Sequence, residues 1–232
     1  MSQSASEEAR PALSRESIVC AATVLIEREG LRSFTMRSLG KELGVSAMAV
    51  YSHFSSRGEV LAAVLERFMA TMDTDPVPGE RWDDTLRRTM TSIYREGVAH
   101  PEISSIEVEP GSGDEGLASH TDKIIRLHLN QGMPEDVLSW AWAMVDAYLT
   151  GFTGNAVAVR KEKAQRERGN ASENTEAPEA PFWRSIVDRA YTDEAFAHGV
   201  EIIIEGVRGL AAPDPCEWRT PEDAGEGPLL AH

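Results

Sequence analysis

The chain is poor in cysteine and has no long apolar run, and these absences exclude whole classes of protein. Its only cysteines are Cys20 and Cys216, so we expect neither a disulfide framework nor a cysteine-based metal site. No segment approaches the roughly 18 consecutive apolar residues that a membrane helix needs. The first residues, MSQSASEEARPALS, lack the basic and then apolar pattern of a secretion signal. These features predict a cytoplasmic protein with no membrane partner.

Motifs that carry catalysis are missing as well. Scattered His, Asp and Glu side chains could form a site in a helical domain, but the chain has no nucleophile elbow, P-loop, H-E-x-x-H motif or paired E-x-x-H motifs. His120 and His128 lie eight residues apart without a neighbouring carboxylate partner, so they do not indicate a metal site. We therefore expect no catalytic residue and no cofactor, and we assign no metal; whether a metal accompanies an effector stays open.

The charge of the chain is unevenly distributed. The formal net charge of −15 by itself argues against a nucleic-acid partner, because phosphates repel an acidic surface. However, residues 1–74 hold 8 basic and 9 acidic side chains, whereas residues 75–232 hold 15 and 29. Segment 31–58 has four basic residues and one acidic residue, a net charge of +3. A small basic region therefore lies near the N-terminus of an otherwise acidic protein.

The pattern of apolar residues predicts an all-α fold. Apolar residues recur at three- and four-residue steps, and strand-like alternation of any length is absent. With 41% hydrophobic residues, the chain can bury a core in one large domain or two small ones. Cap residues and breaks place the expected helices at 15–29, 36–43, 47–54, 57–72, 82–99, 101–106, 117–131, 134–160, 182–190 and 193–211.

Composition also divides the chain into regions. We expect a disordered arm at 1–13, a helix-turn-helix domain at 14–56, a connecting helix at 57–74 and a regulatory and dimerisation domain at 75–211. Within the last domain, the polar and charged segment 160–180 has no apolar periodicity and is predicted to be a flexible loop. Residues 212–232 are expected to form a solvated tail.

The stretch LGKELGVSAMAVYSHF, residues 39–54, has the helix–glycine–helix pattern of a DNA-reading element. Gly44 supplies the positive φ of the turn, and Gly40 allows the two short helices to approach closely. Helix 47–54 then turns a small, mixed polar and apolar surface outward, which fits the DNA major groove. Such corners are common, however, and Tyr-Ser-His can simply end a solvated helix. The local pattern leaves both interpretations open, and the basic segment favours DNA.

Longer motifs in the same region match a known family. They are A-x-x-L-I-x-x-x-G at 22–30, FTMRSLGKELGVS at 34–46 and AVYSHFSSRGEVL at 49–61. In order and spacing, residues 14–72 resemble the DNA-binding domain of the tetracycline-repressor (TetR) family of regulators. DEAFAHGVEIIIEGVRGL at 193–210 more weakly resembles the closing helix of the tetracycline-repressor branch. The resemblance implies an N-terminal three-helix head followed by an all-helical ligand-binding and dimerisation domain.

The resemblance also implies which residues contact DNA. They are Thr35, Met36, Arg37, Ser46, Ala47, Met48, Tyr51, Ser52, His53 and Arg57, with Arg57 in the place of a phosphate-holding lysine. Two departures matter: Ala47-Met48 stands where tetracycline repressors carry Gln-Pro, and Ser52 replaces an aromatic residue. The operator sequence of those repressors therefore does not transfer to this chain.

A single head makes few base contacts, so we expect a homodimer on a palindromic double-stranded DNA operator. The predicted dimerisation residues lie on helices 134–160 and 193–211: Val145, Leu149, Phe196, Val200, Ile203 and Val207. Gly199, Gly206 and Gly209 suggest close approach of another helix. The alternative is that helix 193–211 is buried within its own subunit.

A small-molecule effector is expected in the C-terminal domain. Its predicted contacts are Trp82, Met90, Ile93, His100, His128, Trp140, Met144 and Tyr148, although each could instead be an ordinary core residue. We interpret the chain as a ligand-responsive regulator, most simply a repressor whose two heads change their separation through helix 57–72 when the effector binds. The alternative is a helical DNA-binding architectural or interaction protein without an effector.

Overall fold

The structure is a computed structural model that describes residues 13–108, 111, 115–172, 182–223 and 225. Within these ranges all regular structure is helical, so the all-α prediction is confirmed. No described helix is both long enough and apolar enough to cross a membrane. The helix ends lie within three residues of their predicted positions, except for the C-terminal end of α8. The expected arm, except Leu13, lies outside the described residues.

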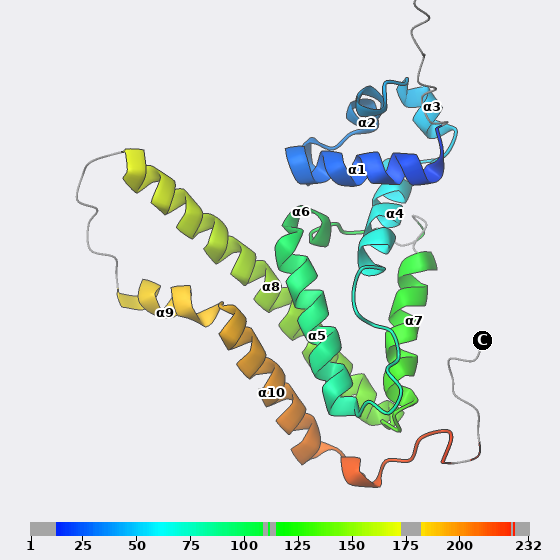
Figure 1. Cartoon of the computed structure of the whole chain (residues 1–232), viewed down its shortest axis with the longest axis vertical. Coiled ribbons are helices and arrows are strands. Elements are labelled where there is room, and N and C mark those ends of the chain that lie inside the picture. Colours follow the sequence, from blue (N-terminus) through cyan, green and yellow to red (C-terminus); the bar gives the residue numbers. More distant parts are fainter. Residues whose placement is uncertain (1–12, 109–110, 112–114, 173–181, 224, 226–232) are drawn as a thin grey trace, which may run out of the picture.

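The N-terminal head contains α1 (Arg15–Glu29), the short 3-10 helix η1 (Leu31–Ser33), α2 (Met36–Leu43) and α3 (Ala47–Tyr51), and α4 (Arg57–Met69) leads out of it (Figure 1). Local chemistry explains where these helices begin. Each α-helix starts at a hydroxyl residue whose side-chain oxygen accepts a hydrogen bond from a backbone N–H of the first turn. These N-caps are Ser14, Thr35, Ser46 and Ser56.

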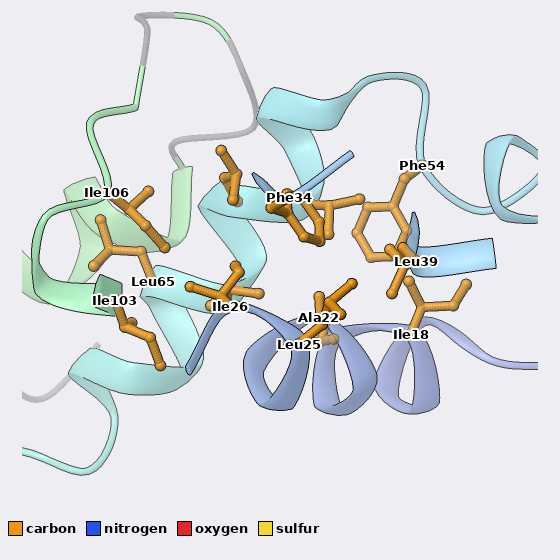
Figure 2. Close-up of a cluster of buried hydrophobic side chains, with 14 of the residues drawn as sticks. Ile18, Ala22, Leu25, Ile26, Phe34, Leu39, Phe54, Leu65, Ile103 and Ile106 are labelled. Atoms are coloured by element: carbon orange, nitrogen blue, oxygen red, sulfur yellow. The ribbon is translucent and has the colours of Figure 1, made fainter. Parts of the chain in front are cut away.

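The core of the head continues into the body. Figure 2 shows Leu25 and Ile26 of α1 directed toward the same apolar cluster as Leu65 of α4. Ile103 and Ile106, which come from α6 and the segment after it, join this cluster and are buried. The head therefore packs against α4 and α6 and is not joined to the body by a linker alone.

The body consists of α5 (Trp82–Ala99), α6 (Pro101–Ser104), α7 (Glu115–Leu129), α8 (Glu135–Ser172), α9 (Phe182–Ala190) and α10 (Asp193–Leu210). Its core is rich in aromatic residues. The ring of Phe196 stacks on Tyr94, with centroids 3.9 Å apart, and also contacts Tyr148 and Phe152. This cluster joins α5, α8 and α10, which lie together in the lower part of Figure 1.

The predicted loop at 160–180 is wrong for its first part, because α8 continues to Ser172. The segment KEKAQRER is polar, but Lys, Glu, Ala, Gln and Arg are all strong helix formers. Ion pairs with α9 add support: Arg166 lies 3.2 Å from Asp188, and Arg184 pairs with Glu162. Residues 173–181 lie outside the described part of the chain.

The solvated tail is also corrected for its first part. Trp218 is buried and lies against Trp82, with ring centroids 5.3 Å apart. Its indole N–H donates to the Pro213 carbonyl at 3.0 Å, across the short 3-10 helix η2 (Pro215–Glu217). Trp218 therefore holds this otherwise polar segment against the N-terminal end of α5, because burial of its large apolar ring is energetically favourable.

Candidate DNA-binding surface and ligand cavity

The corner between α2 and α3 depends on two glycines. Gly44 has a φ of 68°, in the left-handed region, and its N–H donates to the carbonyl oxygens of Gly40 and Lys41 at the end of α2. A Cβ on Gly40 would lie only 3.0 Å from the Val45 carbonyl oxygen and 3.1 Å from the Ala47 nitrogen. Any larger residue at position 40 would push α3 away from α2, so these glycines set the angle at which α3 leaves the head.

The outward face of α3 carries an apolar side chain and an aromatic one. Met48 is 74% exposed and Tyr51 is 44% exposed, which is unusual for residues of this size. Ser46 and Ser52 are exposed beside them, while Ala47 and His53 are half-buried. Such a face can contact thymine methyl groups and base edges in a major groove.

The start of α2 differs from the prediction at one position. The Met36 side chain is only 6% exposed and belongs to the core of the head, so it is not available to DNA. Thr35 is exposed, but its hydroxyl oxygen already caps α2 by accepting from Ser38 N–H at 3.0 Å. Arg37 and Lys41 are exposed and form no ion pair with other described residues. These two cations are therefore available to bind anionic groups such as phosphates.

Arg57 has contacts within the head that its expected role did not include. Its guanidinium donates to the Phe34 carbonyl at 3.1 Å and to the Leu31 carbonyl at 3.3 Å, and it lies over the Phe34 ring. The side chain therefore ties the start of α4 to the segment between α1 and α2. Arg57 is exposed, and an arginine has five N–H donors, so phosphate contact is still compatible with these bonds.

Sequence analysis missed Arg15 at the start of α1. Its guanidinium donates to the His53 carbonyl and to Glu59 at 2.9 Å, and its Cζ lies 3.9 Å from the centre of the Phe54 ring. Arg15 thus holds the C-terminal end of α3 in place. The residues it joins are 38 and 44 positions away, so no local pattern could have revealed the contact.

Ion pairs also neutralise acidic side chains of the head. Glu42 accepts two hydrogen bonds from Arg28, at 2.9 and 2.7 Å, and this pairing lowers the pKa of the carboxyl group. The pKa of Glu59 is lowered as well, chiefly by the backbone N–H of Ser55 and further by Arg15. Two carboxylates of the head are therefore balanced by neighbouring arginines, whereas Arg37 and Lys41 are not balanced.

A large cavity lies in the body, below the head. Its volume is about 720 Å³, and α4, α5, α6, α7 and α8 all contribute to its wall. Of the predicted effector contacts, Met90, Ile93 and His128 line it. Sequence analysis did not single out Trp142, which lines the cavity from α8. The size and the mainly apolar wall suit a drug-sized molecule.

The other predicted effector contacts lie elsewhere. Trp82 packs on Trp218, Tyr148 contacts Phe196, and His100 bonds Glu27 at 2.5 Å. Trp140 is half-buried outside the cavity and Met144 is 57% exposed. The cavity is therefore lined by another face of α8 than the predicted one. The sequence did not distinguish these faces, because successive residues of a helix point about 100° apart and the apolar residues of α8 surround most of it.

The predicted dimerisation residues also need correction. Phe196, Val200 and Val207 are buried in the core of their own subunit, and the half-buried Ile203 packs against the same core. Val145 and Leu149 line the cavity instead. The Tyr148 ring packs directly against Gly199, because a Cβ added at this glycine would lie 2.0 Å from the Tyr148 hydroxyl oxygen. The alternative stated for helix 193–211, burial within its own subunit, therefore holds for this face.

Comparisons with known proteins agree with this architecture. Residues 18–64 match the family model of bacterial regulatory proteins of the tetR family, and residues 75–210 match the model of the tetracyclin repressor-like C-terminal domain. The HTH-type transcriptional repressor DrrR1 of Streptomyces coeruleorubidus is 27% identical over 183 residues, covering 77% of this chain but only 63% of its own length. The class A tetracycline repressor of Escherichia coli is 27% identical over 204 residues, covering 84% and 90%.

A solved structure is also similar. The TetR family protein ActR of Streptomyces coelicolor, in complex with (S)-DNPA, superposes with a TM-score of 0.64 and is 23% identical, covering 86% of this chain and 98% of that one. At this identity the likeness shows the shared fold.

Proposed function

The chain belongs to the tetR family of bacterial regulatory proteins, and from this premise we propose that it is a repressor whose operator binding is controlled by a small molecule in the cavity. One observation carries the proposal: α4 belongs to both the head and the cavity wall. Val60, Leu61 and Val64 pack in the core of the head, and Phe68 and Met69 of the same helix line the cavity. A ligand that alters the packing around the lower half of α4 therefore acts directly on the head.

The DNA contacts that we propose are the exposed ones. Met48 and Tyr51 on α3 meet the base edges, with Ser46 and Ser52 beside them and Ala47 and His53 at the margins. Thr35, Arg37 and Arg57 contact the sugar–phosphate backbone from the starts of α2 and α4. The acidic body repels DNA elsewhere, which favours docking through the head. This function places the protein in the cytoplasm, with the chromosome.

We further propose that the protein is a homodimer, through the two helices that sequence analysis named but mainly through other side chains of these helices. Ile202 of α10 is 71% exposed, and Met144 and Ala147 of α8 are exposed as well. An added Cβ at Gly151 or Gly206 would meet nothing within 4 Å, so these positions leave room for a partner helix. A two-fold dimer would present two heads to half-sites about 34–36 Å apart, which corresponds to a palindromic operator.

The ligand controls binding by differential affinity. A molecule that prefers a second arrangement of α4 and α6 shifts the population toward that arrangement, and a coupling of about 1–3 kcal/mol is typical. If the two heads then no longer match one turn of DNA, the repressor leaves its operator. No catalytic step is part of this function.

A selection experiment tests the proposal. The full chain should enrich a palindromic sequence from a library of random duplexes, and small molecules from a chemically diverse set should release the protein from that sequence. Binding of all duplexes with equal affinity, limited only by salt, would instead support an architectural protein. Specific binding that none of the molecules reverses would argue against control through the cavity.

A further inference from the structure

Among the described residues of the cavity wall, one deeply buried polar side chain makes no hydrogen bond. His128 of α7 lines the cavity and is 3% exposed. Its Nδ1 is buried and makes no hydrogen bond with any described residue. Another wall residue, Thr89, is also buried, but its hydroxyl donates to the Thr85 carbonyl of its own helix at 2.9 Å. A buried imidazole without a partner is unfavourable, so a ligand group that bonds to it would gain affinity.

The charges of the cavity wall disfavour an anionic ligand. Glu102, Glu107 and Asp146 are on the wall, and Lys161 is the one lysine or arginine among the lining residues that the structure describes. Lys161 is already paired with Glu102, at 3.1 Å. The His128 ring is not a cation either, because burial lowers its pKa to about 4. A carboxylate or phosphate placed here would meet three acidic groups and no free cation.

The rest of the wall favours an apolar aromatic body. Trp142 and Phe68 provide ring surfaces, and Met69, Met90 and Met133 provide flexible side chains that adapt to a flat molecule. These residues come from three helices, α4, α5 and α8, and from the junction between α7 and α8, so the apolar surface surrounds the space beside His128.

We infer that the cavity takes an aromatic molecule that has no negative charge and carries a hydroxyl or carbonyl group, and that this group hydrogen-bonds to His128. A neutral imidazole can either donate to a carbonyl or accept from a hydroxyl, so both groups suit it. The inference deepens the proposed function, because it names the chemical class of the ligand at the same cavity.

Three naphthalene compounds test this inference: naphthalene, 2-naphthol and 2-naphthoate. Their binding to the full chain is measured by calorimetry at pH 7.5, where 2-naphthol is uncharged and the carboxylate is ionised. We expect 2-naphthol to bind at least tenfold more tightly than naphthalene and than 2-naphthoate. In His128→Phe, the advantage of 2-naphthol over naphthalene should fall below twofold, while naphthalene binds as before.

Two further variants serve as controls. His120→Phe changes a half-buried histidine of the same cavity and should keep the advantage of 2-naphthol. His128→Gln retains a neutral hydrogen-bonding side chain and should keep at least part of it, and circular dichroism establishes that each variant is folded. An advantage that survives in His128→Phe, tighter binding of 2-naphthoate, or no binding of any compound overturns the inference. Binding as expected without release from DNA supports the inference and contradicts the proposed function instead.

Discussion

The carboxylate of Glu102 accepts a hydrogen bond from the backbone N–H of Leu31, 3.0 Å away in space and 71 residues away in the chain. Its other oxygen accepts from Lys161 of α8 at 3.1 Å. The N–H of Leu31 and the ammonium of Lys161 both lower the pKa of Glu102, so the group stays ionised. Because Glu102 also lines the cavity, one side chain contacts the head, the long helix of the body and the ligand space.

Replacing Glu102 should loosen the head where it meets the body. In Glu102→Ala, Leu31 loses its acceptor, which corresponds to about 1 kcal/mol of local stability for a partly exposed hydrogen bond. We expect amide hydrogen exchange at Leu31 to become about fivefold faster. Glu107→Ala removes another carboxylate of the cavity wall and should leave that exchange rate unchanged. Equal rates at Leu31 in the wild type and Glu102→Ala would show that this bond does not hold the head.

Tyr51 should matter for sequence-specific binding. Tyr51→Ala removes the largest side chain of the exposed α3 face, and we expect the affinity for the selected duplex to fall by about 1–3 kcal/mol without loss of folding stability. Fluorescence anisotropy and thermal unfolding measure the two effects. Trp183→Ala removes an exposed aromatic residue on α9 and should leave affinity unchanged. An affinity within twofold of the wild type would mean that α3 does not face the bases.

Arg37 and Arg57 should differ although both are expected to contact phosphates. Arg37 forms no ion pair with another described residue, so Arg37→Ala should lower affinity for all sequences and reduce the salt slope by about one, with unchanged stability. Arg57→Ala should show the same salt effect and also a lower melting temperature, because it removes two bonds to backbone carbonyls. A change in the selected sequence for either variant would place that arginine at a base.

A carboxylate introduced on the exposed face of α8 and α10 tests whether this face forms the dimer interface. Ile202→Glu should convert the proposed dimer to a monomer, because a carboxylate on each side of a two-fold contact is repelled and desolvated. Sedimentation velocity measures the mass. Val24→Glu places the same charge at an exposed valine of α1 and should remain dimeric. If Ile202→Glu sediments like the wild type, the subunits associate through another surface or do not associate.

Acid should destabilise the protein through His128. The unfolded chain binds a proton at this side chain below about pH 6.5, whereas the folded protein does so only near pH 4. Between these values, stability therefore falls as the pH falls. From pH 7.5 to 5.0, His128 should lower the free energy of unfolding by about 2 kcal/mol. Urea unfolding should therefore show a decrease over this pH range that is smaller in His128→Phe than in the wild type by about that amount. Equal losses would mean that the imidazole is protonated in the folded state.

Much of the fold could be predicted from the sequence because its determinants act over a few residues. Ser14, Thr35, Ser46 and Ser56 each bond an N–H three residues later, and Gly44 needs only its own backbone freedom. The family resemblance was carried by the same local elements, and it is confirmed. The outward position of Met48 and Tyr51 also follows from the period of a single helix whose inner side is Val50.

The cavity and the dimer face depended on tertiary structure instead. The apolar residues of α8 surround most of the helix, so its sequence does not say whether Trp140 or Trp142 faces the ligand space; packing against α5 and α10 decides it. Burial of Met36 and the contact of Arg15 with His53 likewise required the assembled head. The sequence by itself determined where most of the helices begin and end, through short-range bonds; the C-terminal end of α8 is the exception. The three-dimensional packing determined which side of each helix meets solvent, ligand or core, because that choice depends on residues far apart in the chain.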